Sequence, residues 1–150
     1  MVRNWFPNVE PTVSVLRPLG YIIPSEHQDV AETLLQHDIK VQMFSTDMPL
    51  EVESYRVNEI VPASYDYLPP QKIDVEKKKL QTIIKRGDFY VSCAQPGANL
   101  IPSLLEPQSQ YGFIRYRMFN LVPEPGDFFP FYRFVGTKKL PLIPYKNWKR

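Results

Sequence analysis

The chain has 150 residues, of which 43% are hydrophobic and 23% charged, and its net charge is +2. This length and composition suit one globular domain with its own core, and so small a positive charge does not by itself indicate a nucleic-acid partner. The 16 prolines predict short helices and strands joined by long connections, since proline fixes φ and removes a backbone donor.

Residues 1–18 contain several prolines and no continuous apolar run, so we expect an extended arm or linker and not a signal peptide. No apolar run approaches the roughly 18 residues of a membrane span. The single cysteine excludes an internal disulfide and does not indicate a redox compartment. Localisation is therefore unknown from the sequence.

The stretch after the arm has a strand–helix–strand pattern. "LGYII" (Leu19–Ile23) is typical of a buried strand, and "IKVQMFS" (Ile39–Ser45) of a second one. Between them, Ser25 and Gln28 have the spacing of a helix capping box. One face of this helix is apolar: Val30, Ala31, Leu34 and Leu35. The pattern predicts a βαβ unit with parallel strands and a right-handed crossover.

Three further strands are expected. Leu50–Val61 is rich in β-forming residues but alternates imperfectly, which indicates a bent or bulged strand. We interpret Lys72–Ile84 as a strand, although its last apolar residues would also suit a helix, and Phe89–Ser92 as another after a "KRGD" hinge. Lys77–Lys79 are typical of an exposed sheet edge.

The stretch "PGANLIPSLLE" predicts a short helix. A helix capped by Asn99 would have Pro102 in its first turn, where proline is tolerated, whereas a start at Pro96 would require a kink. The aromatic stretches beyond it, "YGFIRYRMFNLV" and "GDFFPFYRFVG", are expected as irregular segments or edge strands.

We therefore predict a single compact α/β domain, in which a mixed β-sheet with a βαβ unit has a few flanking helices. Its parts would be an N-terminal arm or linker (1–18), the domain (19–135) and a proline-broken basic tail (136–150).

The sequence offers little for metal or cofactor chemistry. A catalytic zinc needs three protein ligands, but the only histidines are His27 and His37, ten residues apart and on different faces of a helix. Neither begins a His-x-x-Glu pair, and no glycine-rich phosphate loop is present. We predict no metal, no cofactor and no catalytic residues.

Cys93 lies between a strand and a turn, as the nucleophile of a nucleophile elbow does. The positions two residues away, Val91 and Gln95, are not the small residues that such a turn requires. A base would have to be His27 or His37. We interpret Cys93 as a buried, inert thiol. A small Cys-dependent hydrolase of the glutamine-amidotransferase type is the alternative.

Two stretches are candidate partner-binding surfaces. Arg115 and Arg117 alternate with aromatic residues, a pattern that binds single-stranded bases but more often forms cation–π or carboxylate contacts within a fold. Phe128, Phe129 and Phe131 lie in a dense aromatic run. This run is either a docking face or a lid on the domain's own core, and the sequence leaves both open.

Two long stretches, "RPLGYIIPSEHQDVAETLLQHDIKVQMFSTDMPLEVESYRV" and "KRGDFYVSCAQPGANLIPSLLEPQSQYGFIRYRMFN", have a recognisable order of motifs. An aromatic-Ile-Ile-Pro strand, a Glu-Val-Glu-x-Tyr strand, a Gly-Asp-Phe-Tyr-Val strand and Leu-Leu-Glu-Pro follow one another. This order resembles the C-terminal region of bacterial zinc carboxypeptidase-like proteins, over about residues 17–133.

The family's metal motif belongs to an N-terminal domain that this chain lacks, and its substrate arginine and general-base glutamate have no counterpart here. Pro102 also interrupts a stretch that usually continues as a helix, and "YRMFNLVPEPG" departs from the family's aromatic pattern. The resemblance therefore implies a non-catalytic accessory domain. Its partner would be the carboxypeptidase catalytic domain of the same parent protein, or a peptide or glycan, and not a nucleic acid.

Overall fold

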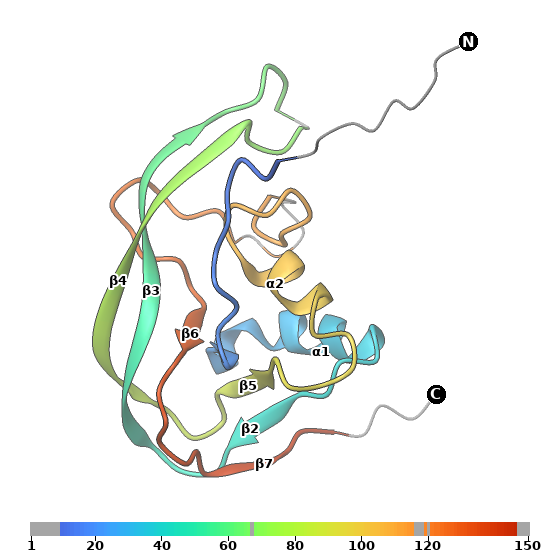
Figure 1. Ribbon diagram of the computed structural model, residues 1–150, viewed down its shortest axis with the longest axis vertical. Coiled ribbons are helices and arrows are strands. Elements are labelled where there is room, and N and C mark those ends of the chain that lie inside the picture. Colours follow the sequence, from blue (N-terminus) through green and yellow to red (C-terminus); the bar gives the residue numbers. More distant parts are fainter. Residues whose placement is uncertain (1–9, 67, 116–118, 120, 147–150) are drawn as a thin grey trace.

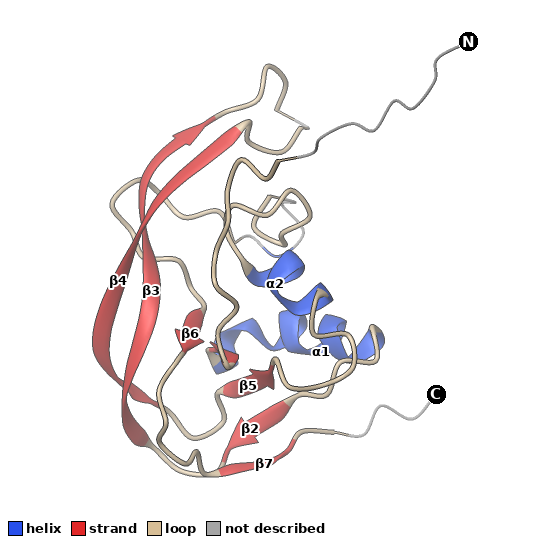
Figure 2. Cartoon of the chain, viewed as in Figure 1, coloured by secondary structure: helices blue, strands red, loops and turns tan. Residues whose placement is uncertain are grey.

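The computed structural model describes residues 10–66, 68–115, 119 and 121–146, which form a mainly antiparallel β fold with short helices (Figures 1 and 2). The strands of this described part form one sheet in the order β4-β3-β6-β1-β5-β2-β7. All pairs of neighbouring strands are antiparallel. The strand bounds are β1 Gly20–Ile23, β2 Gln42–Phe44, β3 Met48–Val61, β4 Lys72–Ile84, β5 Phe89–Ser92, β6 Tyr132–Phe134 and β7 Leu142–Pro144.

The predicted α/β class and the βαβ unit are wrong. Strand β1, the helical segment after it and β2 do follow one another in the chain, but β5 lies between β1 and β2 and pairs antiparallel with both. A strand that arrives much later in the sequence therefore occupies the place of the expected parallel partner. The strand–helix–strand pattern contains no information about such an insertion.

The helical segment after β1 consists of a 3-10 turn, η1 (Ser25–His27), and α1 (Gln28–Gln36). On its predicted apolar face, Val30, Ala31 and Leu34 are buried and Leu35 is partly buried. Neither η1 nor α1 has a side-chain N-cap, so the predicted capping box does not form. Instead, the backbone N–H of Ser25 donates to Oδ1 of Asp88 at 2.9 Å. A carboxylate from the turn before β5 has replaced the local cap.

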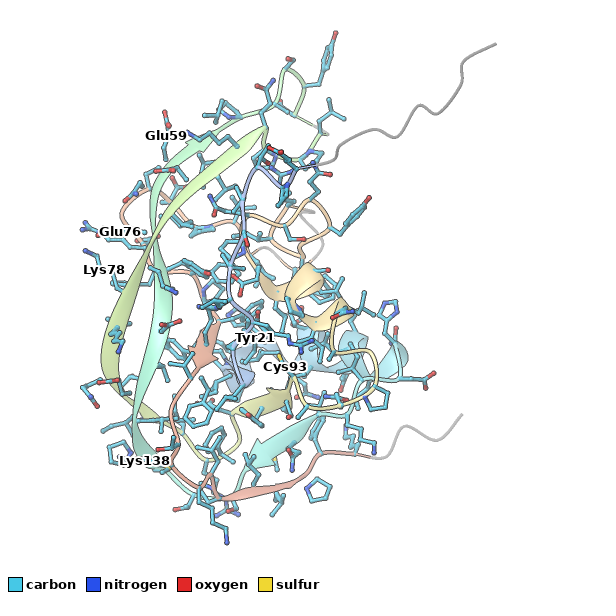
Figure 3. All side chains as sticks on the ribbon, viewed as in Figure 1. Tyr21, Glu59, Glu76, Lys78, Cys93 and Lys138 are labelled. Carbon is cyan, nitrogen blue, oxygen red and sulfur yellow. The ribbon has the colours of Figure 1, made fainter. Side chains whose placement is uncertain are left out.

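Strands β3 and β4 form a long curved ribbon that wraps one side of the molecule (Figure 1). Its register shifts between Val57 and Glu59, which is the irregularity that the sequence suggested. Strand β4 is an edge strand, as its lysines indicated. The labelled side chains of Glu76 and Lys78 point outward from the ribbon (Figure 3), and their charged groups are 2.7 Å apart.

The ribbon buries different faces along its length. Leu50 and Val52 pack into a core cluster with Ile22, whereas Tyr55 packs into a second cluster with Tyr21. Positions 50 and 52 share one strand face and position 55 lies on the other, so the ribbon twists between them. Because consecutive residues of β1 enter different clusters, both faces of β1 are buried, which explains its continuous apolar sequence.

The second half of the chain contains two differences from the predicted arrangement. Strand β6 lies between β3 and β1 in the middle of the sheet and not at an edge. Strand β7 comes from the expected tail and pairs with β2 as the other edge. Helix α2 (Leu100–Leu105) begins after Asn99 with Pro102 in its first turn. Of the two predicted alternatives, this is the one in which Pro102 does not kink the helix.

Candidate functional site

A buried ionic cluster crosses the middle of the sheet. We use the term Arg133 cluster for Tyr21, Glu53, Glu106 and Arg133. In the antiparallel register, Arg133 of β6 lies directly between Tyr21 of β1 and Glu53 of β3. Directly opposed residues of neighbouring strands share a sheet face, so the strand pairing itself brings these side chains together. Glu106 joins them from the end of α2.

Short hydrogen bonds connect the cluster. Arg133 donates from Nε to Oε1 of Glu106 at 2.9 Å and from Nη1 to Oε2 of Glu53 at 2.5 Å. The hydroxyl of Tyr21 donates to Oε1 of Glu106 at 2.6 Å. Only 2% of Arg133 and 5% of Glu106 are exposed. The cluster is therefore largely removed from solvent, and its guanidinium is paired with two carboxylates.

Burial determines the proton affinities around the cluster. It raises the pKa of Tyr21 far above its ordinary value, and the charge of Glu106 raises it further. Burial alone would lower the pKa of Arg133, but Glu106, the two tyrosines and Glu53 together outweigh that effect, so its pKa is raised. Tyr21 is therefore a neutral donor and Arg133 a cation at neutral pH, which suits a structural cluster and does not provide a proton-transfer pair.

The cluster also holds the arm. The arm is residues 10–18, the described part of the expected N-terminal arm. Arg133 donates from Nη2 to the backbone carbonyl of Leu16, and Arg17 donates from Nη1 to Oδ1 of Asn99 at 3.2 Å. In the view of Figure 1, the arm runs between the β3–β4 ribbon and α2 toward β1. The segment before β1, predicted as an extended arm or linker, is therefore hydrogen-bonded to the domain at Leu16 and Arg17.

Side chains of the arm remain exposed although its backbone is held. The exposed fractions are 52% for Val13, 43% for Val15 and 89% for Leu16. Apolar side chains scattered over a surface are ordinary, but here three exposed apolar side chains lie within four residues of one segment. We use the term arm strip for Val13, Val15 and Leu16.

Cys93 is buried in the core cluster that contains Tyr21 and Tyr55, and it lies near Tyr21 in Figure 3. Burial raises the pKa of its thiol to about 11, although the charge of Arg17 lowers it in part. No described contact joins Cys93 to His27 or His37. His27 instead packs edge-on against the ring of Phe131 at 5.8 Å between centroids. This arrangement argues against a nucleophile with an adjacent base.

We expect the Cys93 thiol to react slowly with a disulfide reagent such as dithionitrobenzoate at pH 8. A thiol pKa two units above the unperturbed value of 9.0 reduces the thiolate fraction about 100-fold, and burial limits access further. The control is a Cys93→Ala variant that carries an exposed thiol through Thr46→Cys, which should react rapidly. Rapid labelling of native Cys93 would support the cysteine-hydrolase alternative.

The other candidate residues do not gather in one place. Phe129 and Phe131 are buried in the core, at 3% and 1% exposure, so the surface role proposed for them is wrong. Phe128 remains 45% exposed. Arg115 is half-buried and donates from Nη2 to the carbonyl of Gln71 at 3.2 Å. Arg117 lies outside the described residues.

The Arg133 cluster was not predicted from the sequence. Its signals were charged residues inside apolar stretches: Arg133 in "FYRFV" and Glu106 after "SLL". Charged residues are almost never buried unless paired, but one sequence does not reveal which charge pairs with which.

No family model, curated protein or solved structure matches this chain. Within the described ranges, no three or more His, Cys, Asp or Glu side chains gather closely enough to bind a metal ion. In the same ranges, every helix is too short or too polar to cross a bilayer.

Proposed function

We propose that this chain is a non-catalytic accessory domain of a zinc carboxypeptidase-like protein, and that the arm strip packs against the catalytic domain of the same parent protein. The ordered sequence motifs from about residue 17 to 133 support the family assignment. The chemistry of the described residues is consistent with the non-catalytic role, since Cys93 is a buried protonated thiol and the Arg133 cluster is internally paired.

One observation carries the docking proposal: the arm strip presents apolar side chains on a backbone that the domain already holds in place. Preorganisation lowers the entropic cost of association, because the backbone at Leu16 is already held by its hydrogen bond to Arg133. Burial of Leu16, now 89% exposed, would contribute about 1.5–3 kcal/mol to association. Phe128, the exposed member of the aromatic run, is a second candidate contact.

A binding experiment tests this proposal. The 150-residue chain and the His-x-x-Glu domain of its parent protein are expressed separately, and their association is measured by calorimetry. We expect Leu16→Asp to weaken association at least tenfold, because the change places a charge in the apolar contact. Ile83→Asp is the matched control, since Ile83 is 59% exposed on β4, away from the arm.

Both variants should retain the parent melting temperature, because each changes an exposed side chain. Absence of a His-x-x-Glu domain in the parent protein would contradict the family assignment. Association that Leu16→Asp leaves unchanged would contradict the docking surface while leaving the family assignment in place.

A further inference from the structure

The end of the molecule where the arm begins contains a hollow of about 560 Å³. Thr12 and Val13 of the arm, Lys72 and Ile73 at the start of β4, and Arg115 after α2 are among its lining residues. Figure 1 shows these three segments coming together at the same end of the fold. They are far apart in sequence, so only the tertiary structure creates this hollow.

The hollow is positively charged. Lys72 and Arg115 line it, and no lining residue among those described is acidic. Neither cation forms an ion pair with a described carboxylate. Two cations that converge on one hollow without a counter-charge favour an anion there.

Of the two cations, Arg115 gives the stronger indication of a bound anion. Its Nε atom is buried and has no hydrogen-bond partner in the described structure. One terminal nitrogen, Nη2, donates to the carbonyl of Gln71. A buried donor without a partner is unfavourable, so a ligand oxygen that accepts from Nε would stabilise the complex.

We infer that this hollow binds a small carboxylate-bearing ligand through Arg115 and Lys72. A guanidinium matches the planar geometry of a carboxylate. Phosphate sites usually add several free backbone N–H groups, but in the 109–115 turn the N–H groups of Gly112 and Arg115 already donate to the carbonyls of Ser109 and Gly112.

The rest of the hollow suits the organic part of such a ligand. Val13 and Ile73 supply apolar wall, and Tyr111, which is 70% exposed, supplies an aromatic ring with a hydroxyl. A peptide C-terminus and a sugar acid share this chemistry of a carboxylate on a partly apolar body. The inference does not depend on the proposed accessory function, since the hollow lies within this chain.

The test is a calorimetric titration of the full chain with matched pairs of probes. N-acetyl-leucine is compared with N-acetyl-leucinamide, and glucuronate with glucose. Inorganic phosphate is titrated separately. We expect one or both carboxylates to bind with a dissociation constant below about 10 mM and to bind at least tenfold more tightly than the neutral partner.

Three variants locate the site. Arg115→Gln should weaken carboxylate binding about tenfold to a hundredfold, and Lys72→Gln, at an exposed position, by a smaller factor. Arg86→Gln removes the same charge as Arg115→Gln in the turn beyond the far end of β4, about 40 Å along the strand, and should change nothing. Lys72→Gln keeps the test valid if Arg115→Gln fails to fold.

Several results would overturn the inference: no binding of either carboxylate, equal binding of the acid and its neutral partner, equal losses in Arg86→Gln and Lys72→Gln, or binding of phosphate alone. If the leucine acid binds and glucuronate does not, the ligand class is a peptide terminus. The reverse result assigns a sugar acid. These titrations need no partner domain, so their failure is independent of the docking experiment.

Discussion

Replacement of Arg133 by Met is expected to destabilise the fold by about 3–5 kcal/mol, because the change leaves Glu53 and Glu106 without their shared cation. Only 2% of Arg133 is exposed, so water cannot readily replace the lost hydrogen bonds. The arm would also lose the donor to the carbonyl of Leu16. Urea unfolding followed by circular dichroism measures the loss.

A double-mutant cycle separates charge from packing. Glu106→Gln should be destabilising in the parent chain but less so, or even favourable, in the Arg133→Met background, with a coupling energy of about 1–3 kcal/mol. Arg86→Met, at an exposed position, is the control and should cost less than about 0.5 kcal/mol. Similar costs for Arg133→Met and Arg86→Met would show that the cluster is not formed.

Phe131→Ala is expected to cost about 3–5 kcal/mol of unfolding free energy, since it removes a ring that is only 1% exposed. The ring packs edge-on against Phe129 at 5.1 Å and against His27 at 5.8 Å between centroids. The resulting cavity would lie between the aromatic run and the start of α1, which limits collapse around it.

Phe128→Ala is the matched control for this prediction, three residues away in the same aromatic run. Phe128 is 45% exposed, so its truncation should cost less than about 1 kcal/mol. Thermal unfolding of both variants under identical conditions provides the comparison. Equal costs would contradict the burial difference between the two rings, and a larger cost for Phe128→Ala would reverse it.

These two rings show how much of the candidate site could be predicted from the sequence. The aromatic density of residues 128–134 indicated either a docking face or a lid on the core. The structure divides the run: Phe128 faces solvent, whereas Phe129 and Phe131 enter the core. The choice depends on β3, because Arg56 forms an isolated bridge to Phe128 and the N–H of Phe129 donates to the carbonyl of Tyr55 at 2.7 Å.

The Arg133 cluster shows the same limit. Position 133 lies 27 residues from Glu106 and 80 from Glu53, and nothing local indicates either partner. The cap at Ser25 likewise came from Asp88, 63 residues away, although Gln28 offered a local capping box. In each case the partner is a charged group dozens of residues away in the sequence.

The sequence by itself determined the strands β1, β3, β4 and β5, the apolar face of α1, the presence of a short helix at α2 and the exposed edge of β4. These features follow from hydrophobic periodicity, turn residues and proline stereochemistry, which act within about ten residues. Only the tertiary structure decided the order of the strands, the pairing of buried charges and the convergence of Lys72 with Arg115. The physical reason is that strand pairing and charge pairing join groups dozens of residues apart, and one sequence records their chemistry but not their neighbours.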